Sequence, residues 1–214
     1  MLFSRKKFAA ATIHGKIYVS GGSGTTGTVE EYDPSSDTWR IVSEGSRRRY
    51  GCIGASVGGV FYVIGGLKIG RAGPGTHEAY VYASSMDAYD VMSRVWLRTR
   101  AVPGGGCVVA ACTANGYVYV LASHTVELSF WRYEGKGKEW CRIRSPPLPA
   151  QVRIDGSVRF SCVGVDNKRV LLVQMLRGFK RGLVLVYDSE VGEWSRVADL
   201  PDVIKRPACV SVEC

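Results

Sequence analysis

Four stretches of eight residues decide the fold: Tyr32-Asp33-Pro34-Ser35-Ser36-Asp37-Thr38-Trp39, Tyr89-Asp90-Val91-Met92-Ser93-Arg94-Val95-Trp96, Tyr133-Glu134-Gly135-Lys136-Gly137-Lys138-Glu139-Trp140 and Tyr187-Asp188-Ser189-Glu190-Val191-Gly192-Glu193-Trp194. Each begins with Tyr followed by an acid and ends with Trp seven residues after the Tyr. Successive tyrosines are 57, 44 and 54 residues apart, and the rule uses four of the five Trp in the chain. The chain is therefore an array of four repeats.

A short run of β-favouring residues precedes each stretch: Ile17-Tyr18-Val19, Phe61-Tyr62-Val63, Val118-Tyr119-Val120 and Val170-Leu171-Leu172-Val173. A tight-turn dipeptide stands before each run: His14-Gly15, Gly58-Gly59, Asn115-Gly116 and Asp166-Asn167. These residue types tolerate the positive φ that a two-residue hairpin turn requires. Gly-Gly follows the run in repeats one and two, where it is Gly21-Gly22 and Gly65-Gly66, but not in repeats three and four.

Each repeat is predicted to form four strands. The first precedes the tight turn and the second is the β-favouring run. The third ends at the Tyr-acid pair, and the fourth begins at the Trp. One four-stranded sheet cannot cover both of its own faces, so neighbouring sheets must stack, with Tyr and Trp filling the space between them. We therefore assign the repeated Tyr and Trp to the core.

A period of about 50 residues with four strands per unit resembles the kelch repeat. The resemblance implies an all-β, kelch-type β-propeller with four four-stranded blades, at about 5–44, 47–100, 105–145 and 156–199. Residues 200–214 look like the start of a further blade. Because propellers have about four to eight blades, and kelch propellers usually more than four, we expect an incomplete propeller.

Composition and charge narrow the class of protein. The 214 residues are 46% hydrophobic and 22% charged, which is typical of a globular chain. The sequence has no apolar run long enough to span a membrane, and its first residues do not resemble a signal peptide. The seven cysteines have irregular spacing, and Cys52, Cys107, Cys162 and Cys209 fall in predicted first strands. We expect buried free thiols and a cytoplasmic or nuclear protein.

The first repeat also resembles one branch of the kelch proteins. Arg5-Lys6-Lys7-Phe8-Ala9, Gly15–Gly22 and Val29-Glu30-Glu31-Tyr32-Asp33-Pro34 are similar to plant F-box/kelch-repeat proteins. In that family an F-box docks on the Skp1–cullin ubiquitin ligase, and the kelch propeller captures the target protein. The chain contains no F-box, so the resemblance implies a substrate-capturing part, with ligase binding expected only if an F-box precedes it.

The net charge of +9 indicates an acidic partner. The resemblance implies that ligands bind the face built from the loops between blades and the loops joining second to third strands. On that face we predict a basic surface that binds an acidic or phosphorylated protein segment. The predicted partner-binding residues are Arg5, Lys7, Arg47, Arg48, Arg49, Lys68, Arg71, His77, His124, Arg177, Lys180 and Arg181. A solvated charged surface without a ligand is the alternative.

Other functions are weighed against this one. A kelch-type enzyme or specifier protein with a metal-assisted small-molecule site would need metal ligands, and the chain has three His, which are His14, His77 and His124. We therefore predict a non-enzyme without a cofactor. Nucleic-acid binding is disfavoured because no aromatic and basic platform recurs in the loops. A filament scaffold stays open, since fold does not determine function.

Overall fold

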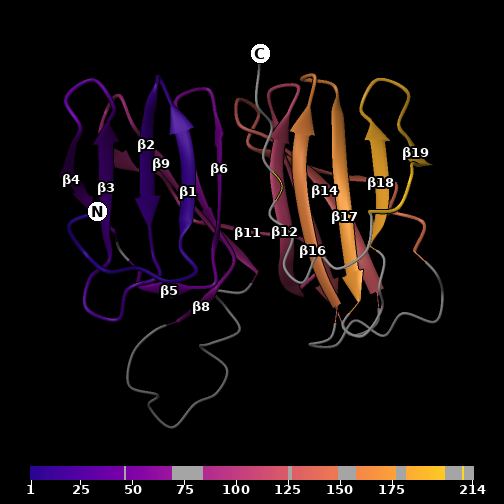
Figure 1. The fold of residues 1–214 in the computed structure, drawn as a ribbon, viewed down its shortest axis with the longest axis horizontal. Coiled ribbons are helices and arrows are strands. Elements are labelled where there is room, and N and C mark those ends of the chain that lie inside the picture. Colours follow the sequence, from indigo (N-terminus) through magenta and orange to yellow (C-terminus); the bar gives the residue numbers. More distant parts are fainter. Residues whose placement is uncertain are drawn as a thin grey trace, which may run out of the picture. The chain divides into compact units, whose positions relative to one another are not determined.

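A computed structural model describes residues 1–45, 47–68, 84–124, 127–148, 158–176, 182–200 and 209 of the chain. Within these ranges the chain forms strands and turns and contains no helix, as Figure 1 shows. The same ranges accordingly hold no helix that could cross a membrane. The prediction of an all-β chain is confirmed. The strands belong to two compact units, Met1–Val108 (unit 1) and Val109–Cys214 (unit 2).

Unit 1 contains blades 1 and 2. Blade 1 is the antiparallel sheet formed in order by β1 (Ala9–Ile13), β2 (Lys16–Ser20), β3 (Thr28–Asp33) and β4 (Thr38–Glu44). Blade 2 is formed in order by β6 (Ile53–Val57), β7 (Val60–Ile64), β9 (Ser85–Asp90) and β10 (Val95–Trp96), with β11 (Arg100–Ala101) also paired to β9. A separate two-stranded ribbon consists of β5 (Arg49–Tyr50) and β8 (Leu67–Lys68).

Unit 2 contains blades 3 and 4. Blade 3 is formed by β12 (Cys107–Ala114), which begins two residues before the unit boundary, β13 (Tyr117–His124), β14 (Glu127–Glu134) and β15 (Glu139–Ile143). Blade 4 is formed by β16 (Val158–Val165), β17 (Arg169–Leu176), β18 (Leu183–Asp188) and β19 (Glu193–Arg196). The expected start of a further blade at 200–214 lies outside the described residues, apart from Leu200 and Cys209.

The repeated Tyr and Trp are cross-strand neighbours in every blade. The ring centroids of the four pairs are 5.0, 5.3, 4.9 and 5.2 Å apart in blades 1 to 4. The third strand ends at the acid after Tyr, as predicted. The fourth strand begins one residue before Trp, because that residue pairs with the acid, as Thr38 does with Asp33.

The acid after Tyr stabilises the turn between the third and fourth strands. The Asp90 carboxylate accepts hydrogen bonds from the backbone N–H groups of Met92 and Ser93, each at 3.0 Å. Asp188 accepts from Glu190 and Val191 at 2.8 and 3.0 Å. The backbone N–H groups of Val191 and Glu190 lower the pKa of Asp188, because they favour its ionised form. The repeated acid therefore has a structural role.

The other predicted turn signals also appear in the backbone. Residues of all four tight-turn dipeptides have positive φ, between 49° and 77°. Both Gly-Gly pairs do as well, and Gly21-Gly22 lies where blades 1 and 2 meet. The backbone N–H of Gly22 donates to the carbonyl oxygen of Arg49 at 2.7 Å. The Gly-Gly prediction thus marks a contact between neighbouring blades as well as a local turn.

Neighbouring blades share a core within each unit. In unit 1 this core contains Ala9, Ile13, Tyr18 and Val29 of blade 1 and Cys52, Phe61, Val63 and Tyr89 from the blade 2 side. In unit 2 it contains Ala110, Cys112, Ala114, Tyr119, Leu121 and Phe130 of blade 3 and Val170, Leu172, Leu185 and Tyr187 of blade 4. The assignment of the repeated Tyr to the core is confirmed for Tyr89, Tyr133 and Tyr187, whereas Tyr32 and all four Trp are half-buried.

The Trp of the later blade in each unit joins it to the earlier blade. The indole Nε1–H of Trp96 donates to the Glu44 carbonyl oxygen at 3.0 Å, at the end of β4. The indole Nε1–H of Trp194 donates to the Arg144 carbonyl oxygen at 2.7 Å, just after β15. The same interaction therefore recurs between the two blades of each unit.

The six cysteines that the structure describes are free thiols. Cys52 and Cys112 are buried and Cys162 and Cys209 are half-buried, whereas Cys107 and Cys141 are exposed. The expectation of a buried thiol was wrong for Cys107, because this residue begins β12, before the strand enters the core.

Gly22→Ala tests the close packing of the Gly-Gly turn against the segment before β1. The φ of Gly22 is 71°, and an added Cβ would lie 2.7 Å from the Lys6 carbonyl oxygen and 2.8 Å from the Phe8 Cβ. We expect the substitution to lower the free energy of unfolding by about 2 kcal/mol or more, measured by urea denaturation.

Gly24→Ala is the matched control. An added Cβ there meets nothing within 4 Å, so stability should change by less than about 0.5 kcal/mol. Equal effects of the two substitutions would contradict the tight contact.

Candidate functional site

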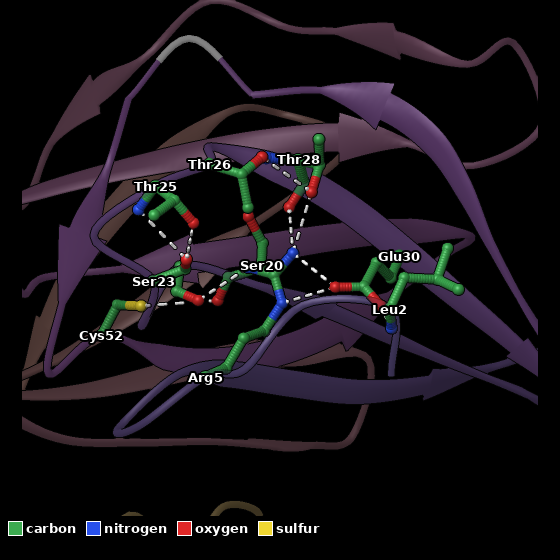
Figure 2. A network of polar contacts seen from close by, with 10 residues as sticks. Leu2, Arg5, Ser20, Ser23, Thr25, Thr26, Thr28, Glu30 and Cys52 are labelled. Carbon is green, nitrogen blue, oxygen red and sulfur yellow. Dashed lines mark hydrogen bonds and ion pairs between the residues drawn. The ribbon is translucent and has the colours of Figure 1, made fainter.

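Arg5 is buried inside blade 1. Its Nε–H donates to Glu30 Oε1 at 2.8 Å, and its Nη1–H donates to the Gly21 carbonyl oxygen at 2.8 Å. Nη2 donates to the carbonyl oxygen and the hydroxyl of Thr28, at 3.1 and 2.9 Å. Figure 2 shows the guanidinium between Glu30 and Thr28. The side chains of Arg5 and Glu30 are both 0% exposed, so their ion pair lies in the interior.

Arg49 makes the same interactions in blade 2. Its Nε–H donates to Asp87 Oδ2 at 2.9 Å, and its Nη1–H donates to the Gly65 carbonyl oxygen at 2.8 Å. Nη2 donates to the Ser85 hydroxyl at 2.9 Å and to Asp87 at 2.7 Å. We call each of these arrangements an arginine clamp: an Arg before the first strand, the first Gly of Gly-Gly, and a hydroxyl and an acid on the third strand.

These contacts correct two predicted site residues. Arg5 and Arg49 were predicted on the partner-binding surface, yet both are buried and fully engaged inside their blades. A buried guanidinium needs a carboxylate and several acceptors, and each clamp supplies both. The signal was present in the sequence, because Glu30 and Asp87 each stand two residues before the repeated Tyr.

Repeats three and four lack the clamp. Trp131 and Leu185 occupy the positions of the clamp acids, two residues before Tyr133 and Tyr187. The first position of Gly-Gly is occupied by Ala122 in blade 3 and by Gln174 in blade 4, and both are buried. The loss of Gly-Gly therefore accompanies the loss of the acid in both blades of unit 2.

Four exposed cations of unit 1 lie beside the clamps. Lys6, Lys7, Arg48 and Lys68 are exposed. Lys68 pairs with Arg49 in the β5–β8 ribbon, and Lys7 Nζ lies 5.4 Å from the ring centroid of Tyr50 in the same ribbon. Together with Arg47 they form what we call the basic edge of unit 1.

Backbone contacts hold the basic edge together. Lys6 N–H donates to the Gly22 carbonyl oxygen at 2.9 Å, and Gly51 N–H donates to the Lys7 carbonyl oxygen at 2.9 Å. Arg48 Nη1–H donates to the Gly24 carbonyl oxygen at 3.1 Å, which places its side chain over the β2–β3 loop. The segments before blades 1 and 2 and the β2–β3 loop therefore present their cations together.

Arg47 lies between the interior and the surface. Its side chain is 26% exposed, and Nη1 is 3.9 Å from Asp87 Oδ1. Asp87 is already bound by Arg49, so Arg47 adds a second positive charge to a single buried carboxylate. Among the described residues outside the clamps, Glu44 at the end of β4 is the exposed carboxylate on this edge. The basic edge thus carries a net positive charge.

Of the remaining predicted site residues, one belongs to unit 2 and five lie outside the described residues. His124 is exposed at the end of β13, in unit 2. Arg71, His77, Arg177, Lys180 and Arg181 lie outside the described residues, and their role stays a prediction.

A second charged cluster lies within blade 1 and is balanced. Glu31 accepts hydrogen bonds from Tyr18 Oη at 2.6 Å and from Arg40 Nε at 2.8 Å, and Lys16 Nζ lies 3.2 Å from Glu31 and 2.7 Å from Asp33. Burial alone would raise the pKa of Glu31, but the hydrogen bonds from Tyr18, Arg40 and Lys16 outweigh it and lower the pKa. Opposite charges are paired here, so the cluster offers no site for an anion.

The part of the chain that the structure describes contains no set of side chains that could bind a metal ion. Three or more His, Cys, Asp or Glu side chains do not come together there in an arrangement that could hold an ion. The basic edge of unit 1 is therefore the candidate site, and its chemistry is suited to binding anionic groups.

Comparison with known proteins shows what this chain is similar to. A family model described as Kelch motif matches residues 4–46. The F-box/kelch-repeat protein At5g26960 of Arabidopsis thaliana is 56% identical over 237 residues, a match that covers 100% of this chain and 57% of the relative. Human Kelch-like protein 23 is 24% identical over 98% of this chain and 35% of its own length. The chain thus spans little more than half of the first relative.

Breaking one arginine clamp should destabilise unit 1. Arg49→Met would leave the Asp87 carboxylate, whose side chain is 6% exposed, without its main partner. We expect the free energy of unfolding to fall by about 3 to 5 kcal/mol, measured by denaturation followed through tryptophan fluorescence.

Arg48→Met, one residue away on the surface, serves as the control and should change stability by less than about 0.5 kcal/mol. Adding Asp87→Leu to Arg49→Met should restore part of the loss, because no unpaired charge then remains buried. A double variant less stable than Arg49→Met alone would contradict the role given to the ion pair.

Proposed function

Since this chain is a kelch-repeat protein similar to plant F-box/kelch-repeat proteins, we propose that it is a protein-interaction module that binds an acidic or phosphorylated segment of its partner. The single observation that carries the proposal is the division of basic residues of unit 1 between the interior and one exposed edge. Arg5 and Arg49 are used in the interior, whereas Lys6, Lys7, Arg48 and Lys68 are left on one exposed edge.

The chemistry of this edge favours an anionic segment over a neutral one. A single exposed ion pair contributes about 0.2 to 1 kcal/mol, so several must act together to give useful affinity. Arg48 can present two N–H groups to one carboxylate or phosphate, whereas the lysines act as point charges. A segment with several acids or a phosphorylated residue would engage the edge at several points.

Hydrophobic contact is available beside the charges. Leu67 in the ribbon is 48% exposed, and the ring of Tyr50 is half-buried beneath Lys7. Apolar contact strengthens an electrostatic encounter, because charges chiefly increase the rate of association. The favoured partner segment therefore carries an apolar side chain close to its acids.

We further propose that the partner is a substrate of an F-box ubiquitin ligase, with the chain as the substrate-capturing part in the cytoplasm or nucleus. The identity of 56% to a protein named for its F-box and kelch repeats supports this. The free thiols of the described cysteines fit a reducing compartment. Immunoprecipitation of the endogenous gene product should recover a Skp1-type protein, and its absence under conditions that recover the target would contradict the ligase role.

Charge reversal tests the binding edge. The probe is an array of peptides that carry phosphoserine or glutamate beside an apolar residue, with serine and glutamine versions as neutral counterparts. We expect the combined Lys6→Glu, Lys7→Glu, Arg48→Glu and Lys68→Glu variant to bind the acidic peptides at least about tenfold more weakly and with little dependence on salt.

Arg94→Glu is the matched control, because Arg94 is exposed in the β9–β10 turn, at the other end of blade 2. It should bind as the wild type does. Unchanged binding by the variant with four substitutions would overturn the proposal. So would wild-type binding to the neutral peptides that is as tight as its binding to the acidic ones.

A further inference from the structure

Two thiols meet in the core of unit 2. Cys112 belongs to β12 and is 7% exposed, within the cluster of buried side chains that joins blades 3 and 4. Cys162 belongs to β16 and packs against the same cluster. The two residues are therefore contributed by the first strands of neighbouring blades.

The register of blade 4 shows where Cys162 points. Cys162 pairs directly with Leu172, so the two side chains lie on the same face of the sheet. Leu172 is 1% exposed and belongs to the core shared with blade 3. Cys162 consequently faces blade 3.

Backbone packing brings the two strands close together at this point. Gly164 lies two residues beyond Cys162 and hence on the same face. A Cβ built on Gly164 would overlap the carbonyl oxygen of Thr113, the residue after Cys112. The nearby thiol of Cys112, together with burial, raises the pKa of Cys162 well above its ordinary value.

The corresponding place in unit 1 is closed to such a pair. Counted back from the last residue of each first strand, Ala11 corresponds to Cys112 and Gly54 to Cys162. A Cβ built on Gly54 would overlap the backbone of Ala10. Blades 1 and 2 therefore touch through backbone where blades 3 and 4 hold two sulfur atoms.

We propose that Cys112 and Cys162 are a redox pair that closes to a disulfide and links blade 3 to blade 4 when the chain meets a hydroperoxide. Two S–H bonds and the O–O bond of the hydroperoxide break, and one S–S bond forms. The two electrons from the thiols reduce the peroxide to an alcohol and water, which take up the two protons. A dithiol reductant reduces the S–S bond and restores both thiols. The proposal rests on unit 2 alone and is independent of binding at the basic edge.

The bond would join two strands that belong to different sheets. It would close the chain between residues 112 and 162, which restricts the unfolded state. We expect oxidation to raise the temperature of unfolding of unit 2 by roughly 5 °C or more, and a dithiol to return it to its starting value.

The test uses the whole chain, treated with tert-butyl hydroperoxide and then alkylated under denaturing conditions. We expect a mass loss of two hydrogens, one peptide pair joining Cys112 to Cys162, and alkylation of the other five cysteines. Alkylation of both Cys112 and Cys162 after oxidation, or a bond from either to another cysteine, would overturn the proposal. This measurement needs no variant and so does not depend on the folding of one.

Variants supply the second readout. Cys112→Ala and Cys162→Ala should each abolish the oxidative rise in unfolding temperature, whereas Cys141→Ala, at an exposed cysteine of the same unit, should retain it. A rise that persists in Cys162→Ala would show that another reaction stabilises the protein and would refute the pair.

Discussion

The blades of this chain have apolar side chains on both faces, and this constraint determines the rest of the structure. In β13 the five consecutive residues Val118 to Ala122 are all at most 1% exposed. Successive strand residues point to opposite faces, so such a run requires cover on both sides of the sheet. Within each unit, the second blade covers one of these faces. The Tyr–Trp pair, the indole hydrogen bonds and the shared cores are the means by which one sheet is held against the next.

Both units are built from four-stranded blades, but the side chains buried at the clamp positions differ between them. In unit 1, each blade encloses an arginine clamp, and positive-φ glycines bring carbonyl oxygens to the guanidinium. In unit 2, Trp131 and Leu185 replace the acids. A buried ion pair must have all its partners, so the Arg, the acid and the first Gly of a clamp act together. The joint absence of the acid and of this Gly from repeats three and four follows from this dependence.

The division of the cations has a direct bearing on function. Arg47, Arg48 and Arg49 are consecutive, yet Arg49 is 1% exposed, Arg48 is exposed and Arg47 lies between them. Adjacent side chains of this segment point in different directions, so an Arg-rich segment can serve a blade and a partner at once. Net charge alone overstates the number of basic residues on the surface, because Arg5 and Arg49 are paired with acids inside the fold.

Sequence by itself determined the repeats, the strand ends at Tyr and the acid, the tight turns and the all-β class, because these depend on residue type and spacing along the chain. It also placed Lys7, Arg48 and Lys68 in loops on one face. It did not distinguish the buried Arg5 and Arg49 from these exposed cations, although the acids Glu30 and Asp87 indicated which arginines would be paired. Tertiary structure decided which cations are buried and which thiols meet. Burial and pairing depend on residues 25 to 50 positions apart, such as Arg5 with Glu30 and Cys112 with Cys162, that only the stacking of strands and blades brings together.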